Sequence, residues 1–101
     1  MLDSEVERFL QIIQMRLGKA RREAGLTQEE TADRAALPVR TYQGLEGIRG
    51  RRRFNPTILT LYAVSKAVNL ELEKLIKQPS LEEIHVLENI FEVTISSQTN
   101  K

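Results

Sequence analysis

Residues 25–47 read GLTQEETADRAALPVRTYQGLEG, a pattern that predicts two short helices joined by a tight turn. Thr27 can cap the first helix through its side-chain oxygen, and Glu30 can reach back to the cap, which completes a capping box. Helix onset is therefore expected directly after Thr27. Leu37 precedes a proline and is disfavoured in the α region, so the turn is expected there. Pro38 suits the opening of the second helix.

The second helix has one apolar face and one polar face. Leu37, Leu45 and either Thr41 or Tyr42 fall three or four residues apart and are expected to face the core. The opposite face is short, polar and basic, and it contains Val39, Arg40, Gln43 and Gly44. A face of this kind could enter a DNA groove.

The segment TQEETADRAALPVRTYQGLEG resembles the helix-turn-helix of phage-repressor-like regulators, the Xre/Cro-type family. The resemblance extends over roughly Leu17 to Ile76, with the motif itself at about residues 27–46. Thr31 stands where the family usually has a core aliphatic residue, and Ala36 where it usually has glycine. The implied fold is all-α: a five-helix lambda-repressor-like DNA-binding domain, followed here by a C-terminal extension.

The resemblance implies that the second motif helix, about 38–46, enters the major groove of double-stranded DNA. Arg40 suits guanine, Gln43 suits adenine, and Val39 can touch a thymine methyl group. Gly44 lets the backbone come close to the bases. The residues expected to bind backbone phosphates are Thr27, Gln28 and Thr41.

The family also places an ion pair beneath the DNA-facing loop. The matching positions here are Arg21, late in the first helix, and Glu46, at the end of the second motif helix. The alternative is that both side chains are solvated surface charges, a pair worth about 0–1 kcal/mol.

Directly after the motif the chain reads IRGRRRFNP, where four of five consecutive residues are arginine. Guanidinium groups offer forked donors to phosphates and displace counterions from DNA. The residues expected to hold the DNA backbone are Arg49, Arg51, Arg52 and Arg53, and they should set affinity more than sequence preference. A solvated loop and insertion into a narrow minor groove are the alternatives.

The charge distribution supports a nucleic-acid partner more than the net charge of +1 does. Residues 16–53 contain ten Lys or Arg and five Asp or Glu, a balance of +5, whereas residues 70–101 contain three and six, a balance of −3. A basic block beside an acidic block is expected of a chain with one face for nucleic acid.

Composition limits the other classes. A chain of 101 residues, 41% of them hydrophobic, predicts one small core. The absence of cysteine excludes disulfides and thiolate metal sites, and His85 is the only histidine, so no metal site is expected. The acidic start MLDSEVERFL and the lack of a long apolar run predict no signal peptide and no membrane span, and hence a cytoplasmic protein. No catalytic arrangement or nucleotide-binding loop is recognisable, so neither an enzyme nor a cofactor is predicted.

The first helix is expected to start after Ser4, which can form a capping box with Glu7, and to continue to about Ala24. Its apolar stripe contains Val6, Leu10, Ile13, Leu17, Ala20 and Ala24. Phe9 and Ile12 lie beside the stripe, and a partner subunit or the chain's own tail could cover them.

Asn55 and Pro56 are expected to cap and open another helix. Its predicted core face contains Ile58, Leu61, Tyr62, Ser65 and Val68. Asn69 suits a left-handed helix stop, and a further short helix is expected over 72–76. The predicted DNA-binding domain is therefore residues 1–77.

The tail predicts an extension over 78–96 and a disordered end over 97–101. Ser80 and Glu83 form another capping pair before a short helix, and residues 90–96 alternate with a period of two. Phe91, Val93 and Ile95 would share one face of a strand. A lone strand has unpaired edges, so it is expected to pair with, or pack across, its copy in a homodimer.

Three functions fit these patterns. The first is a sequence-specific transcriptional regulator, a dimeric repressor that binds a palindromic operator. The second is an antitoxin that regulates its own synthesis and captures a protein partner through the tail. The third is a protein-interaction module of the same fold that does not read DNA. The arginine cluster argues against the third, because an adaptor has no need of it.

Overall fold

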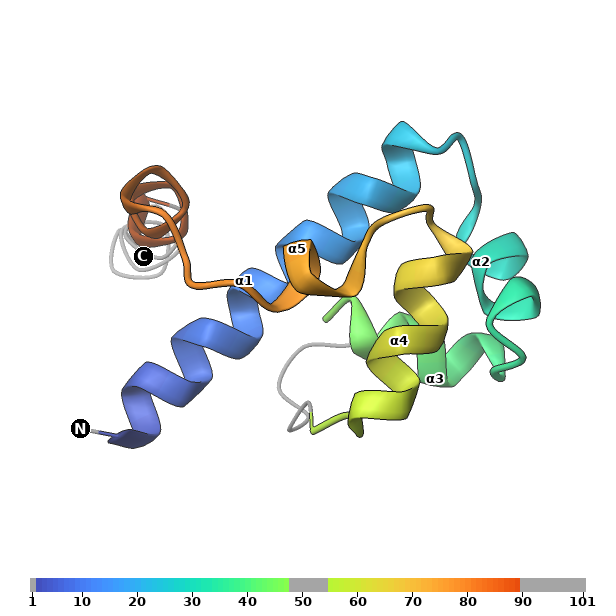
Figure 1. Cartoon of the computed structure of the whole chain (residues 1–101), viewed down its shortest axis with the longest axis horizontal. Coiled ribbons are helices and arrows are strands. Elements are labelled where there is room, and N and C mark those ends of the chain that lie inside the picture. The colour runs from blue at the N-terminus through green and yellow to red at the C-terminus, as the bar shows by residue number, and fades with distance from the viewer. Residues whose placement is uncertain (1, 48–54, 90–101) are drawn as a thin grey trace, which may run out of the picture. The chain divides into compact units, whose positions relative to one another are not determined.

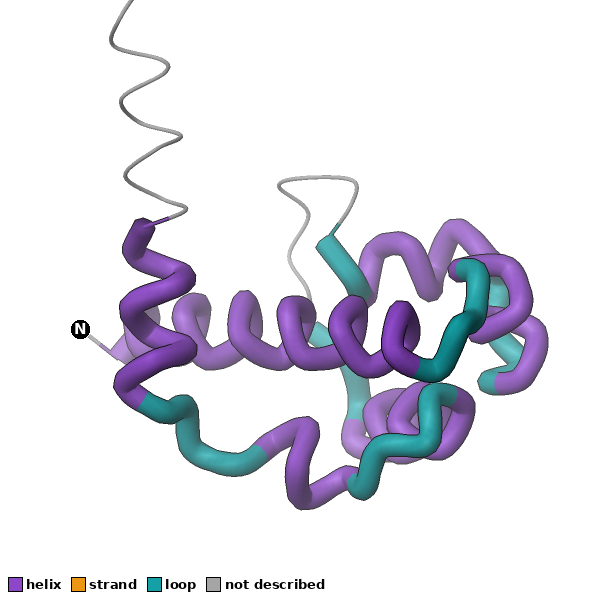
Figure 2. The backbone as a smooth tube through the Cα atoms, turned by 90° about the horizontal axis from the view of Figure 1, so that it is seen from above, coloured by secondary structure: helices purple, strands orange, loops and turns teal. Residues whose placement is uncertain are grey.

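The computed structural model describes residues 2–47 and 55–89, and every secondary-structure element in those ranges is a helix (Figures 1 and 2). The predicted all-α class is therefore confirmed for the described residues. The helices are α1 (Leu2–Glu23), α2 (Gln28–Arg34), α3 (Val39–Leu45), α4 (Ile58–Ala67), α5 (Leu72–Ile76) and a further helix over 81–89. The predicted strand over 90–96 lies outside the described residues.

The helices belong to two compact units. One unit is Ile13–Lys77, which contains the C-terminal half of α1 and all of α2 to α5. Among the described residues, the other contains 2–12 together with 78–89. Ile12, which a partner subunit or the chain's own tail was expected to cover, is fully buried, and Phe9 is partly exposed.

Local signals in the sequence account for three of the helix ends. Thr27 caps α2 by accepting a hydrogen bond from the Glu30 N–H, and the Glu30 carboxylate accepts one from the Thr27 N–H, as the capping box predicts. Ser80 and Glu83 make the same reciprocal pair before the helix over 81–89. Asn69 has φ of 59°, the predicted left-handed stop after α4.

Two predicted helix starts are wrong. α1 begins at Leu2, ahead of the proposed cap at Ser4. α4 is capped by Thr57, whose hydroxyl oxygen accepts from the Thr60 N–H, and not by Asn55. Threonine and asparagine are both good caps, so composition alone could not choose between two candidates two residues apart.

The core of the larger unit forms where α2 packs on α3 and on α4, and α4 packs on α5. Its buried apolar residues include Ile13, Leu17, Ala32, Tyr42, Leu45, Leu61, Val64, Ala67, Val68 and Leu75. Thr31, where the family that the sequence resembles usually has an aliphatic residue, is fully buried, and its hydroxyl donates to the Thr27 carbonyl at 2.9 Å. No buried side-chain nitrogen or oxygen in the described parts of the chain lacks a hydrogen-bond partner.

The predicted core face of α4 needs correction. Leu61, Ser65 and Val68 are buried, but Ile58 and Tyr62 are 56% and 50% exposed. The helical spacing was compatible with either placement, because α4 is apolar around most of its circumference.

Candidate nucleic-acid interface

The site is organised around the carboxylate of Glu46, the residue that follows α3. Its side chain is only 4% exposed, and the Arg21 Nε donates to Oε2 at 2.6 Å while Nη2 donates to Oε1 at 3.3 Å. The Tyr42 hydroxyl also donates to Oε2, and the Gln28 Nε2 donates to Oε1 at 3.2 Å. The two residues that the resemblance paired are therefore joined, and two further donors complete the cluster.

These contacts shift the pKa values of the cluster. Burial alone would raise the pKa of Glu46, but the hydrogen bonds from Arg21, Tyr42 and Gln28 outweigh it and hold the pKa below its ordinary value. The hydrogen bond to Glu46 raises the pKa of Arg21. Burial, and then the hydrogen bond to Glu46, raise the pKa of Tyr42. At neutral pH the cluster thus contains a carboxylate, a guanidinium and a neutral phenol.

Arg21 connects three segments of the chain. Besides binding Glu46, its Nη1 donates to the Leu26 carbonyl at 2.8 Å. α1 also approaches closely at Gly18, where an added Cβ would lie 3.5 Å from the Glu46 carboxylate. The end of α1, the connection to α2 and the end of α3 are consequently fixed to one another, which sets the orientation of α3.

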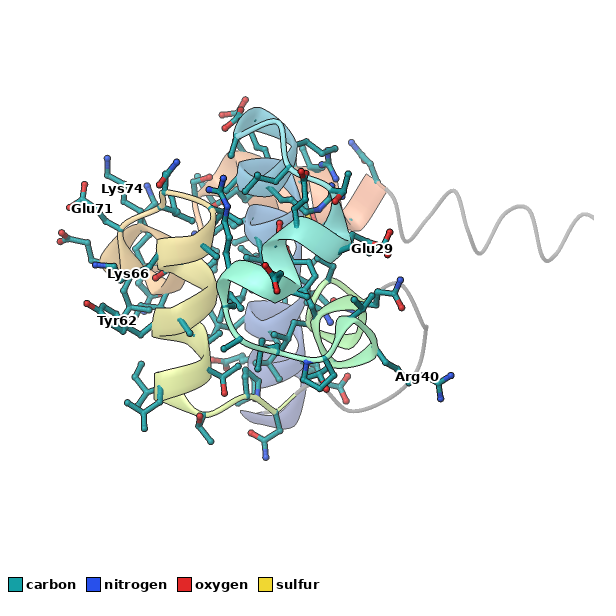
Figure 3. The ribbon with its side chains drawn as sticks, turned by 90° about the vertical axis from the view of Figure 1, so that its right-hand side faces the viewer. Glu29, Arg40, Tyr62, Lys66, Glu71 and Lys74 are labelled. Carbon is teal, nitrogen blue, oxygen red and sulfur yellow. The ribbon has the colours of Figure 1, made fainter. Side chains whose placement is uncertain are left out.

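The outward side of α3 is open to solvent. Arg40, Thr41 and Gly44 are exposed, and Val39 and Gln43 are partly exposed. Figure 3 shows the Arg40 side chain projecting away from its unit. Of Thr41 and Tyr42, either of which could have faced the core, Tyr42 is the buried one. Its hydroxyl can be buried because it donates a hydrogen bond to Glu46.

Gln43 and Gln28 touch each other. The Gln43 Nε2 donates to the Gln28 Oε1 at 3.4 Å, near the upper limit for a hydrogen bond. Because Gln28 also donates to Glu46, its amide has a fixed orientation. The sequence nominated both residues, but it gave no indication that they are linked.

Arg16 was wrongly counted with the basic residues that could face DNA. Arg16 belongs to the block counted as positive, yet it is 9% exposed and its Nη1 donates to the Leu75 and Lys77 carbonyls at 2.9 and 2.8 Å. Arg16 therefore satisfies the C-terminal carbonyls of α5 and adds little to the charge that DNA would meet. The sequence signal that could have indicated the burial of Arg16 is its position between the apolar residues Met15 and Leu17.

Several predicted site residues lie outside the described ranges. They are Arg49, Arg51, Arg52 and Arg53 in the basic loop, and Phe91, Val93 and Ile95 in the tail. Within 2–47 and 55–89 no three acidic or histidine side chains gather as a metal site would require. No helix among those residues is long and apolar enough to cross a membrane.

Comparison with known proteins shows which family of proteins the chain belongs to. The chain is 41% identical over 58 residues to an uncharacterized HTH-type transcriptional regulator, y4dJ, of Sinorhizobium fredii (strain NBRC 101917 / NGR234), a match that covers 57% of this chain and 70% of the relative. The chain belongs to the HTH-type transcriptional regulators. No family model and no solved structure matches it.

In this HTH regulator, α2, the connection over 35–38 and α3 have the helix-turn-helix form. The turn is closed by hydrogen bonds from the Ala36 N–H to the Asp33 carbonyl at 3.1 Å and from the Leu37 N–H to the Ala32 carbonyl at 2.9 Å. Ala36 has φ of 58°, a left-handed conformation that glycine adopts most easily, and glycine is the usual residue there in the family that the sequence resembles.

Proposed function

We propose that this regulator is of the Xre/Cro type and reads a specific DNA sequence by inserting α3 into the major groove. The observation that carries the proposal is the contrast between the two sides of α3. Its inner side is fixed by buried Tyr42, Leu45 and the Glu46 cluster, while Arg40 and Gly44 are exposed on the outside. Rigid presentation of a few polar side chains is what base recognition requires.

In this proposal Arg40 pairs with guanine, Gln43 with adenine, and Val39 contacts a thymine methyl group. Gly44 supports close approach, since no atom from beyond its own helix turn lies within 4 Å of the position that a Cβ would take. Gln43 must leave Gln28 to reach a base, and the length of that bond, 3.4 Å, makes the exchange inexpensive.

Contacts to phosphates would position the protein without selecting sequence. Thr27 uses its hydroxyl oxygen as an acceptor in the capping box, which leaves the hydroxyl hydrogen available to a phosphate. Thr41 is exposed beside Arg40 on α3. The arginine cluster over 49–53 would supply most of the salt-dependent affinity.

The regulator would act as a dimeric repressor on a palindromic operator, because a two-fold protein reads two half-sites. The domain that binds DNA would comprise residues 1–77 and the extension residues 78–96. Occupation of the operator would then respond to the concentration of the protein.

A second candidate is an antitoxin that autoregulates through the same surface. The observation that favours it lies in the C-terminal segment, where Leu81 and Val86 are 76% and 43% exposed. Exposed apolar side chains there could contact a partner protein. A co-purified toxin whose binding is lost in Leu81→Ser would support this candidate.

Selection of bound sequences from a random DNA pool, followed by binding measurements on the selected site, tests the main proposal. Arg40→Ala should weaken binding by about 1–3 kcal/mol and relax the preference at one base pair. Arg52→Ala should weaken all sequences alike and reduce the salt slope by about one unit. Lys19→Ala removes an exposed cation of α1, outside α2, α3 and α4, and serves as the control. An Arg40→Ala protein with undiminished discrimination would show that α3 does not read bases through this residue.

A further inference from the structure

A second arginine of α1 lies beside the Glu46 cluster. A Cβ added at the buried Gly18 would lie 3.5 Å from the Glu46 Oε1 and 3.2 Å from the Arg22 Nη1. Arg22 follows Gly18 by one turn of the same helix, and side chains of a helix lean toward its N-terminus. The Arg22 guanidinium therefore extends back over Gly18, next to the carboxylate that Arg21 holds.

The Glu46 carboxylate does not neutralise Arg22, because other donors already occupy it. Oε2 accepts from the Arg21 Nε and the Tyr42 hydroxyl, and Oε1 accepts from the Arg21 Nη2 and the Gln28 Nε2. These donors account for the roughly four lone-pair sites of a carboxylate. Arg22 is exposed, and no residue in 2–47 or 55–89 makes an ion pair or a hydrogen bond with its guanidinium. Those residues thus leave its positive charge without a partner.

The start of α2 lies at the same carboxylate. The Gln28 Nε2 donates at 3.2 Å to Oε1, the Glu46 atom that lies nearest to the Cβ position of Gly18. Arg22 and Gln28 therefore approach Oε1 from two elements, the last turn of α1 and the first residue of α2. The Gln28 Nε2 has a second hydrogen, so an anion at this place could accept from both side chains. A phosphate is the anion that the proposed function brings to the start of α2.

We propose that Arg22 binds a backbone phosphate of the DNA beside the start of α2. The inference rests on the proposed function, because it takes the duplex to lie against α2 and α3. Arg21 and Arg22 then have different tasks, since successive helical residues point about 100° apart. Arg21 fixes Glu46 within the protein, and Arg22 adds a forked donor to the DNA-binding surface. A phosphate contact raises the affinity for every sequence and selects none.

The test measures binding of the full chain to its selected DNA site and to an unrelated duplex over a series of salt concentrations. Arg22→Ala should weaken binding to both duplexes by roughly tenfold at low salt and reduce the salt slope by about one unit. Arg22→Lys keeps the charge and should retain the slope of the wild type. Lys19→Ala is the matched control, because it removes another exposed cation of α1 and should leave the slope unchanged. Urea denaturation should show the Arg22→Ala protein to be as stable as the wild type.

Three results would overturn the inference. They are an Arg22→Ala protein with the affinity and salt slope of the wild type, an equal loss of slope in Arg22→Ala and Lys19→Ala, and a change of base preference in Arg22→Ala. Arg40→Ala, measured in parallel, separates this inference from the proposed function. If Arg40→Ala loses discrimination while Arg22→Ala changes nothing, the phosphate contact is refuted and the reading of bases by α3 stands. If Arg22→Ala lowers the slope while Arg40→Ala keeps full discrimination, the phosphate contact stands and the role of Arg40 is refuted.

Discussion

Replacing Arg21 with methionine tests whether the Glu46 cluster holds the helix-turn-helix together. The substitution keeps an apolar stem and removes the guanidinium that donates to Glu46 at 2.6 and 3.3 Å. The side chains of Arg21 and Glu46 are only 15% and 4% exposed, so the pair is screened by protein more than by water. Breaking a buried pair costs about 3–5 kcal/mol, because the remaining charge has lost its partner.

The cost for Arg21→Met should be at the lower end, about 3 kcal/mol, since Tyr42 and Gln28 continue to donate to the carboxylate. The free energy of unfolding would be measured by urea denaturation at neutral pH, followed by circular dichroism. A small domain with about 5–15 kcal/mol of stability should remain folded. Adding Glu46→Gln removes the unpaired charge, so the double variant should recover at least about 1 kcal/mol of that loss.

The exposed pair Glu71 and Lys74 provides the control within the same protein. Its side chains are 65% and 62% exposed, and Lys74→Met should change the free energy of unfolding by no more than about 0.5 kcal/mol. If Arg21→Met costs no more than this control, the Glu46 cluster does not stabilise the fold and the reasoning from its burial is wrong.

Two further predictions concern the same motif. The lowered pKa of Glu46 means that its stabilising effect is present above its ordinary pKa of 4.5 and is lost as the pH falls through the lower folded value. Glu46→Gln should therefore lose less stability than the wild type between neutral pH and acid in parallel urea titrations, and an equal loss would contradict the assigned shift. Ala36→Gly should raise the free energy of unfolding by about 0.5–1 kcal/mol, because Ala36 has φ of 58°. Ala35→Gly, at φ of −86°, should lower the free energy of unfolding, because alanine already fits that conformation. Thermal unfolding compares the two variants, and an Ala36→Gly protein less stable than Ala35→Gly would contradict this prediction.

The local sequence was sufficient for much of the helical frame. The capping boxes at Thr27 and Ser80 and the left-handed stop at Asn69 were predictable because each depends on atoms within a few residues. The order of α2, turn and α3 followed from these signals together with the resemblance. The outward side of α3 was predictable as well, apart from the choice between Thr41 and Tyr42.

Tertiary structure decided what depends on contacts distant in sequence. Arg16 and Arg21 are alike in the sequence, yet one satisfies the end of α5 and the other the carboxylate at the end of α3. The exposure of Leu59 and Tyr62 could not be predicted either, because a helix that is apolar on both sides carries no periodic signal for which side is covered. Packing makes that choice, since it depends on where the other helices lie in space.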